Sequence, residues 1–483
     1  METISQGMDA YIQDQMGRLN LPGSALAIVE GDRIVHLRGF GKARPGGETP
    51  GPQTPFFIGS LTKSFTALGV MQLFEAGKLE LDEPVRCFLP WFRVADPHAS
   101  SRMTVHHLLH QTSGLPMLAG MAVLGDLDCS SEACERQARA LASLKLTRPV
   151  GSRFEYSNLN YNLLGLVIEA ASGERYADII QRHIFDPLDM RHSYTSKAAA
   201  QADGLAVGYR YWLGQPLPAA DLPIPAGSLA SGQLISCAED MGHYLIAHLN
   251  GGRYRDKQIL SEAGIRELHR PAVEIHEMGQ SLGHYGMGWI SGNIREDRIV
   301  WHSGIVPDFG GFMALVPGQQ KAFVWLYNAN HAMLKLALDQ AGMGAAHRLA
   351  GHPAPPAHPE VSLWLMRSLL AVPVLQGLEI LATLRRSRLR RPPTVAARLR
   401  EGLGRLPHLA AGLGLLFSLG KMRGFVRLFM PDAAWMALIS GAIATAWVGL
   451  IAVLALREQR GWKRRRAGLT TKSAQVERMD WVG

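Results

Sequence analysis

The feature that most constrains this chain is an uncharged segment near its C-terminus. Residues 433–456 (AAWMALISGAIATAWVGLIAVLAL) run for 24 positions without a formal charge. A helix rising about 1.5 Å per residue crosses a hydrocarbon layer of about 30 Å with a segment of this length. A buried core helix is the alternative, but core helices seldom stay apolar all round for so long. We therefore expect a membrane-spanning helix.

Two weaker apolar segments precede it, at residues 361–384 and 406–420, so we expect about three transmembrane helices in a membrane domain of residues 361–456. Eight arginines and one acid lie in residues 385–405, and six basic residues and one acid in residues 457–466. Basic loops stay in the cytoplasm. Three crossings then place residues 1–350 on the periplasmic or extracellular side of the inner membrane, and residues 457–483 form a basic cytoplasmic tail.

The positive charge of the chain belongs to its apolar end. The formal net charge is +9, yet residues 361–483 carry +14, and the first 360 residues carry −5. A basic and apolar tail favours a lipid bilayer as partner over nucleic acid. Residues 351–360 (GHPAPPAHPE) hold four prolines and are typical of a stiff linker. The first fifteen residues lack the apolar region of a signal peptide. Either the sequence begins after a removed or missed leader, or the inferred orientation is wrong. We expect the former, because eight arginines in one loop are hard to place outside.

Residues 1–350 have the pattern of an α+β domain. Residues 23–41 read as two strands around a Gly-Asp turn, and residues 322–328 as another strand. Helical spacing covers residues 61–76, 161–171, 177–185 and 331–349. Strands at both ends with helices between them predict one sheet that joins the two ends of the domain.

The first chemical motif is Ser60-Leu61-Thr62-Lys63. If Ser60 opens a helix, Lys63 lies one turn further on the same face. An adjacent ammonium and helix-start N–H groups both favour the alkoxide form over the hydroxyl. Alone the motif is weak: Ser418 and Lys421 have the same spacing, and Ser60 could instead be a helix cap.

Two further motifs complete a candidate site. Tyr156-Ser157-Asn158 offers a phenol, which a nearby ammonium could hold partly ionised, and an amide at i+2 that could orient a substrate amide. His302-Ser303-Gly304 follows an apolar run readable as a strand, and the glycine would let a substrate backbone approach its edge. A competing match at His284 lacks such a strand in the sequence pattern. A loop tyrosine and a structural histidine are the alternatives.

Together and in this order, the motifs resemble the serine β-lactamase and penicillin-binding-protein superfamily, most closely its branch of class C β-lactamases, D-alanyl-D-alanine carboxypeptidases and D-aminopeptidases. The resemblance covers about residues 8–350 and includes HHLLHQTSGLP, GSLASGQLISCAEDMGHYL, YGMGW and HSGIVPDFGGFMALVP. It implies a β-lactamase-like α+β fold, in which an antiparallel sheet is flanked by helices and an all-helical region. It also implies a serine hydrolase that needs no metal and no cofactor.

The resemblance also implies a role for each motif residue. Ser60 would be the acylated nucleophile, Lys63 its activator and Tyr156 the proton relay. The substrate-binding residues would be Asn158, His302, Ser303, Gly304 and Ile305, with the oxyanion hole formed by the N–H groups of Ser60 and Ile305. Which of the lysine and the tyrosine is the base stays open.

His302 stands where many relatives carry lysine. An unperturbed histidine is mostly neutral at pH 7, so we expect its attraction for a substrate carboxylate to be weak and pH-dependent. Activity on a carboxylate-bearing substrate should then fall as His302 loses its proton between pH 5 and 8.

The layout of a family domain followed by three spans is similar to the membrane-bound peptidases that mature nonribosomal peptides, such as the colibactin-maturing peptidases. Phe57, three residues before Ser60, departs from the acidic residue expected there, so the substrate side chain stays open. The leading hypothesis is a membrane-anchored peptidase acting on a small D-amino-acid-containing or peptidoglycan-like amide. The alternatives are an esterase or β-lactamase on the same nucleophile, and a non-catalytic cell-wall-binding sensor.

Overall fold

A computed structural model describes residues 4–277, 280–389 and 422–479. The chain divides into two compact units, each described by itself below. The first combines Met1–Met366 with the distant segment Met422–Met430, and the second combines Arg367–Lys421 with Pro431–Gly483.

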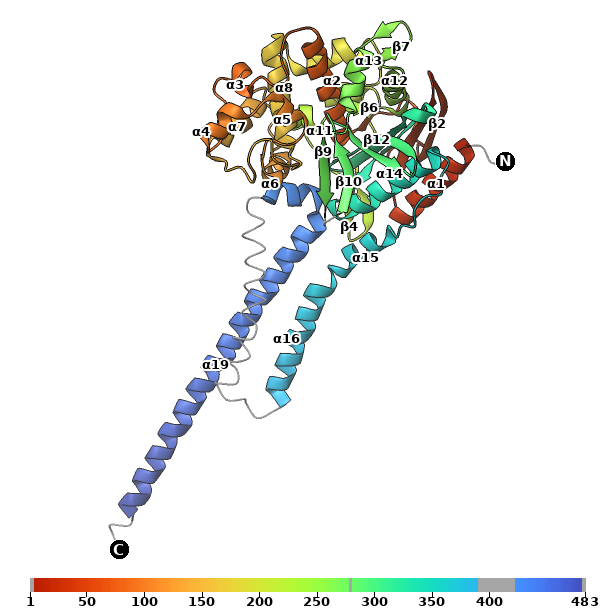
Figure 1. Cartoon of the computed structure of the whole chain (residues 1–483). Coiled ribbons are helices and arrows are strands. Elements are labelled where there is room, and N and C mark those ends of the chain that lie inside the picture. Colours follow the sequence, from red (N-terminus) through yellow and green to blue (C-terminus); the bar gives the residue numbers. More distant parts are fainter. Residues whose placement is uncertain (1–3, 278–279, 390–421, 480–483) are drawn as a thin grey trace. The chain divides into compact units, whose positions relative to one another are not determined.

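The first unit is built on an eight-stranded antiparallel sheet with the strand order β2-β1-β14-β13-β12-β11-β10-β9 (Figure 1). β1 pairs with β14 in register Ala25 to Leu326, so the sheet joins the two ends of the domain as the sequence predicts. The strands are β1 (Gly23–Glu30), β2 (Arg33–Gly41), β9 (Val273–Glu277), β10 (Gln280–Tyr285), β11 (Ile290–Ile294), β12 (Asp297–Val306), β13 (Phe309–Val316) and β14 (Lys321–Tyr327).

Both faces of the central strands are buried. In β1, Ala25 and Ala27 enter one hydrophobic core while Leu26 and Ile28 enter a second on the opposite face, because successive side chains point to opposite sides of a strand. Helices α1 (Ile4–Leu19) and α14 (Lys335–Leu349) pack together over the second core, side by side in Figure 1.

The first core lies between the sheet and a helical region. Its longest helices are α2 (Thr62–Glu75), α8 (Asn158–Ser172) and α12 (Ala238–Leu249). Shorter helices are α3 (Val85–Phe88), α4 (Pro97–Arg102), α5 (Val105–Leu109), α6 (Met117–Ala122), α7 (Ala133–Arg139), α9 (Tyr176–Ile180), α10 (Lys197–Ala202), α11 (Leu229–Gly232) and α13 (Glu262–Leu268). Three smaller sheets complete the unit. Strands β3 (Phe56–Phe57) and β6 (Ile235–Ser236) pair beside α2, and β7 (Arg253–Tyr254) pairs with β8 (Lys257–Gln258). The third sheet has the order β15 (Ala329–Asn330), β4 (Tyr209–Trp212), β5 (Gln215–Pro218).

The predicted helices and strands of this unit are confirmed, with shifts at their ends. The expected helix at residues 177–185 divides into α9 and a π-helical turn at Gln181–Phe185. The expected helix at residues 331–349 begins at Lys335, because residues 332–334 form a tighter 3₁₀ turn. Helix ends are where periodicity constrains the backbone least.

The Pro-rich segment that we expect to act as a linker is fastened to the domain at its end. The guanidinium of Arg18 in α1 donates to the carbonyl of Ala357 at 2.7 Å and to the carboxylate of Glu360 at 2.9 Å. Leu363 and Met366, in the helix that follows, are buried in the second core. The start of this helix therefore belongs to the first unit.

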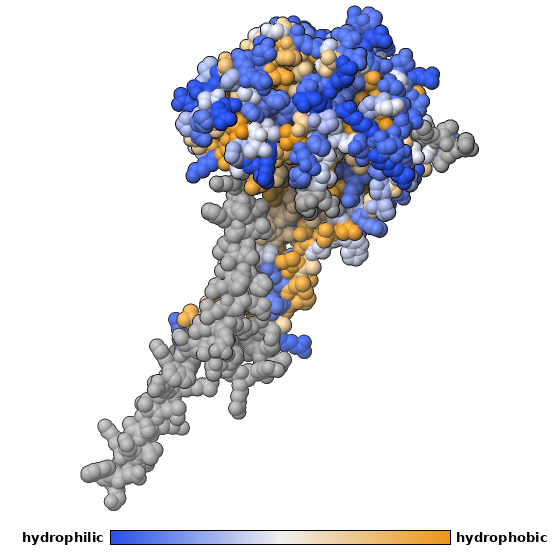
Figure 2. Space-filling model, in the orientation of Figure 1, coloured by the Kyte–Doolittle hydropathy of each residue, from blue (hydrophilic) through white to orange (hydrophobic). Residues whose placement is uncertain are grey.

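The C-terminal helices include two that are long and apolar enough to cross a membrane. They cover Glu360–Ala382 and Pro431–Val453, and their mean hydropathies are 1.5 and 2.1. Their length and composition alone make them candidate membrane helices. The first contains α15 (Glu360–Ser368) and part of α16 (Ala371–Leu389), whose exposed side chains are largely apolar (Figure 2). The second opens α19 (Pro431–Met479). The third expected span, residues 406–420, lies outside the described residues.

Candidate active site

Ser60 is held at the entrance of α2 by a turn that only glycine fits. Gly59 has a φ of +58°, and a Cβ there would lie 2.5 Å from the backbone nitrogen of Ile305. The turn joins β3 to a 3₁₀ segment, Gly59–Leu61, that leads directly into α2. Ser60 is half-buried and Lys63 lies one turn further, so the predicted geometry of the first motif is confirmed.

Lys63 is fully buried with three oxygen partners. Its Nζ lies 3.0 Å from Ser60 Oγ, 2.8 Å from Asn158 Oδ1 and 2.6 Å from the carbonyl oxygen of Ser231. Burial lowers the pKa of Lys63 well below its usual value, because a buried ammonium loses its hydration. A carbonyl and an amide oxygen do not replace a carboxylate counter-ion, so the neutral amine is favoured.

The hydrogen bonds of the neutral amine match these partners. Its two N–H groups suit the oxygens of Asn158 and Ser231, which can only accept. The remaining lone pair then faces Ser60 Oγ and can accept the hydroxyl proton. This count makes Lys63 the group best placed to act as the base.

Tyr156 completes the contact with the nucleophile. Its hydroxyl donates to Ser60 Oγ at 2.9 Å, and Lys63 Nζ lies 4.9 Å from the centre of its ring. Withdrawal from water raises the pKa of Tyr156 well above its usual value, and the neighbouring Tyr285 adds to this. The expectation that an ammonium holds this phenol partly ionised is therefore wrong, because Lys63 is itself driven toward the neutral form.

Asn158 faces Lys63 rather than open solvent. Its Oδ1 accepts from Lys63, and its Nδ2 donates to the carbonyl of Gly120 at 3.1 Å, so both ends of the amide are engaged. In this structure the amide orients the lysine. A contact with a substrate amide, as the resemblance implies, stays a prediction and requires Nδ2 to leave Gly120.

The strand edge at residues 303–305 lies against the nucleophile turn. A Cβ on Gly304 would overlap the carbonyl oxygen of Ile58 and lie 2.9 Å from the backbone nitrogen of Ser60. The backbones of β12 and the Ser60 turn are thus in direct contact. This brings the backbone of Ile305 beside that of Ser60, the arrangement that an oxyanion hole requires.

We predict that Gly304→Ala lowers acylation of Ser60 by about 10²- to 10³-fold, the size of effect of a lost oxyanion donor, because the methyl group separates β12 from the Ser60 turn. Gly292→Ala is the matched control, since that glycine lies in β11 of the same sheet and a Cβ there meets nothing within 4 Å. Burst kinetics with an activated ester measure both variants. Equal acylation rates for the two would contradict the close contact.

His302 is buried beneath the strand edge. Its Nδ1–H donates to the carbonyl of Ser303 at 2.6 Å, and its Nε2 lies 3.5 Å from the hydroxyl of Tyr285. Burial is the main cause that lowers the pKa of His302, to about 3. The imidazole is therefore neutral throughout pH 5–8, and the expected change of its charge in that range is wrong.

The neutrality of His302 can be tested with two substrates that are identical except that one carries a carboxylate where the other carries a primary amide. Because His302 has no proton to lose above a pKa of about 3, the ratio of their kcat/KM values is expected to stay constant from pH 5 to pH 8. Steady-state kinetics across this range measure the ratio. A decline centred near pH 6.5 would restore the cationic role of His302.

The sequence pattern missed several parts of this site. The carbonyl of Ser231 holds Lys63, and no side-chain motif identifies a carbonyl. Tyr285, at the end of β10, contacts His302. The competing His284 also lies in β10, so a strand is present there, contrary to expectation. The side chain of His284 is exposed. Gln280–Tyr285 (QSLGHY) contains no β-branched residue, so the sequence pattern does not mark it as a strand.

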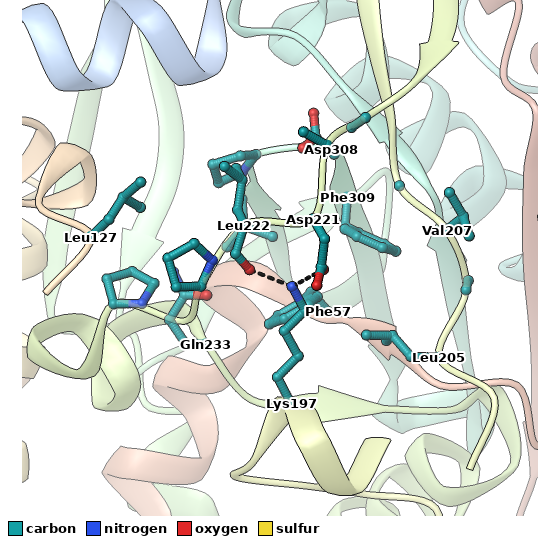
Figure 3. Close-up of a pocket in the computed structure, with 18 of the residues that line it drawn as sticks. Phe57, Leu127, Lys197, Leu205, Val207, Asp221, Leu222, Gln233, Asp308 and Phe309 are labelled. Atoms are coloured by element: carbon teal, nitrogen blue, oxygen red, sulfur yellow. Dashed lines mark hydrogen bonds and ion pairs between the residues drawn. The ribbon is translucent and has the colours of Figure 1, made fainter. Parts of the chain in front are cut away.

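A cavity of about 400 Å³ is lined by Phe57, three residues before Ser60, and by Val306, which follows Ile305. Figure 3 shows Phe57 among its lining residues. Ser60, Lys63 and Tyr156 do not line it. Its walls are largely apolar: Phe57, Leu124, Leu127, Leu205, Val207, Leu222, Val306 and Phe309. The charged residues that line it are all in ion pairs, Lys197 with Asp221, and Asp308 with Arg210 outside the lining.

Comparisons with known proteins identify the family of this chain. A family model described as Beta-lactamase matches residues 8–346. The chain is 26% identical over 333 residues to Protein flp of Staphylococcus aureus (strain MW2), covering 67% of this chain and 63% of that protein. It is 26% identical over 344 residues to the unguisins hydrolase ungD' of Aspergillus campestris, covering 68% of this chain and 63% of that protein. The chain thus spans less than two thirds of the length of these curated relatives.

Solved structures resemble the fold as well. The octameric penicillin-binding protein homologue from Pyrococcus abyssi matches with a TM-score of 0.63 and 29% identity, covering 75% of this chain and 80% of that one. A class C beta-lactamase matches with a TM-score of 0.59 and 20% identity, covering 73% and 97%. The second likeness concerns the fold alone.

Proposed function

Because this chain belongs to the Beta-lactamase family and is a serine hydrolase, we propose that it cleaves an amide of a small D-amino-acid-containing or peptidoglycan-like substrate through an acyl-enzyme on Ser60. The observation that carries the proposal is the position of Ser60 Oγ, 3.0 Å from Lys63 Nζ and 2.9 Å from the Tyr156 hydroxyl. One hydroxyl between an amine and a phenol has both a proton acceptor and a proton donor within reach.

In the proposed acylation, Ser60 Oγ attacks the substrate carbonyl carbon while the neutral Lys63 amine takes the hydroxyl proton. The carbonyl electron pair moves to oxygen, and the N–H groups of Ser60 and Ile305 stabilise that charge. The bond to the leaving group then breaks. Tyr156 gives the leaving group a proton and recovers one from the Lys63 ammonium, so protons balance. Water releases the acyl group by the same steps in reverse.

The neutral His302 affects which substrate fits best. A carboxypeptidase binds the terminal carboxylate of its substrate, and a cation beside the strand edge would help it to do so. With its pKa near 3, His302 does not supply that charge at neutral pH. We therefore favour an internal amide, as in a peptide-maturing D-peptidase, over a terminal D-alanyl-D-alanine bond.

The neutral His302 also favours a second candidate function, an esterase, since an ester substrate without a carboxylate needs no cation in the site. A β-lactamase activity uses the same nucleophile and is tested alongside.

We further propose that the two apolar helices anchor the enzyme in the cell membrane as part of a multi-pass domain, with the catalytic unit on the outer side. Their length and hydropathy support the anchor, and the arginine-rich segments support its orientation.

The experiment offers the purified full chain a panel of internal D-amino-acid peptides, D-alanyl-D-alanine peptides, muropeptides, neutral esters and a penicillin. Intact-mass spectrometry detects the acyl-enzyme and peptide mapping locates it. Preferred turnover of internal D-peptides with an adduct on Ser60 supports the proposal. Turnover of esters alone assigns the esterase, and the absence of any adduct or turnover contradicts both.

A further inference from the structure

A short segment from between the candidate membrane helices packs on the catalytic unit. Residues 422–429 are helical and belong to the same compact unit as the active site, although residues 367–421, which include most of the first candidate membrane helix, separate them from the rest of that unit in sequence. Phe425, Leu428 and Phe429 are buried, whereas Arg423 and Arg427 are exposed. Spacing of three and four residues puts the buried side chains on one face. We call residues 422–430 the wall segment.

The contact is close enough to involve the backbones. A Cβ on Gly125 would lie 2.5 Å from Gly424 Cα, and a Cβ on Gly424 would lie 2.7 Å from Gly125 Cα. Two glycines therefore meet at the point where the segment crosses the residues after α6. Any larger residue at either position would push the two backbones apart, which gives the segment a defined seat.

The seat is the outer side of the apolar cavity. The wall segment contacts Leu124, Leu127 and Leu222, and the same three leucines line the cavity beside Phe57. It also contacts Ile305, whose N–H is the proposed oxyanion donor. The side chains of these three leucines thus separate the wall segment from the cavity.

The cavity lies on the acyl side of the proposed reaction. The leaving group departs beside Tyr156, which gives it a proton, and Tyr156 does not line the cavity. With the leaving group on the Tyr156 side, the proposed reaction directs the acyl part of the substrate the other way, past Ile305 toward Val306, which lines the cavity. Because the charges at the rim are paired, the cavity offers this group mainly apolar surface.

We propose that residues 422–430 form the outer wall of the acyl-binding cavity and make the enzyme select substrates with a bulky apolar acyl group. This inference rests on the proposed function, since it assumes an acyl-enzyme on Ser60. The C-terminal region then contributes to substrate choice as well as to anchoring. Pro431, at which α19 begins, follows the wall segment directly, so the wall and a candidate membrane helix are covalently continuous.

The test compares p-nitrophenyl octanoate with p-nitrophenyl acetate on the full chain. In Gly424→Ala the added methyl meets Gly125, and in Phe425→Ala the buried ring is lost. For both variants we expect the octanoate-to-acetate ratio of kcat/KM to fall by about 10-fold, because apolar contacts discriminate by roughly this factor. Gly449→Ala is the control, since a Cβ there meets nothing within 4 Å, and its ratio should not change.

Active-site labelling separates the two hypotheses. A small fluorophosphonate should label Ser60 in every variant at a rate within about twofold of the parent chain, since such a probe does not need the apolar cavity and neither Gly424 nor Phe425 contacts Ser60, Lys63 or Tyr156. Labelled variants with an unchanged ratio would overturn the wall proposal alone. Equal loss on both esters with slower labelling would overturn it too, since the segment would then be a structural support. If the parent chain is not labelled at Ser60, the proposed function itself fails.

Discussion

Ser60→Ala is expected to lower turnover by on the order of 10⁶-fold, the size of loss when the nucleophile of a serine hydrolase is removed. The Oγ atom is the only group placed between Lys63 Nζ and the Tyr156 hydroxyl among the described residues. Alanine leaves both partners without the atom that forms the acyl bond. Turnover of the best ester and intact mass after treatment with a fluorophosphonate measure the loss.

The chain contains its own control for this variant. Ser418 and Lys421 repeat the spacing of Ser60 and Lys63 in a segment outside the described residues. Ser418→Ala should keep full turnover and full labelling, because spacing alone does not make a nucleophile. An adduct that persists in Ser60→Ala, or disappears in Ser418→Ala, would move the reaction away from Ser60.

Lys63→Arg is expected to lower acylation by about 10²- to 10⁴-fold, the usual contribution of a general base. A guanidinium keeps its proton at every pH at which the protein is folded, so it cannot accept one from Ser60. The lysine can, because burial lowers its pKa and its lone pair faces Oγ. Single-turnover acylation with an activated ester isolates the affected step.

Lys63→Met separates loss of the base from disruption of the fold. The methionine is uncharged and of similar length, so it leaves no unpaired charge in the buried site. It should lose acylation to the same extent while thermal unfolding stays cooperative. Lys257→Arg, at an exposed position on β8, is the control and should retain activity. If Lys63→Arg acylates at the parent rate, a different group removes the proton.

The pairing of Ser60 with Lys63 could be predicted because both lie on one helix. Residues three apart are neighbours on a helix surface whatever else the chain does. Tyr156 and Gly304 lie far along the chain, and their place beside Ser60 followed from the resemblance rather than from spacing. In the structure, Lys63 Nζ and the Tyr156 hydroxyl lie within hydrogen-bond distance of Ser60 Oγ.

The protonation states could not be predicted in this way. The same pattern suggested an ionised phenol and a titrating imidazole, and burial reverses both: the pKa of Tyr156 is raised and that of His302 is lowered to about 3. Desolvation depends on how much protein surrounds a group, which no local motif encodes. The carbonyl of Ser231, which holds Lys63, is likewise invisible in a side-chain pattern.

From the sequence alone followed the properties that depend on nearby residues: the β1–β2 hairpin, the Ser60 turn of helix, the apolar length of residues 433–456 and the separation of charge along the chain. Only the tertiary structure decided what depends on distant residues meeting. It seats Gly424 against Gly125, encloses an apolar cavity beside Phe57 and buries the lysine amine. The physical reason is that periodicity reports the environment of one element, whereas contact and dielectric are set by every element packed around it.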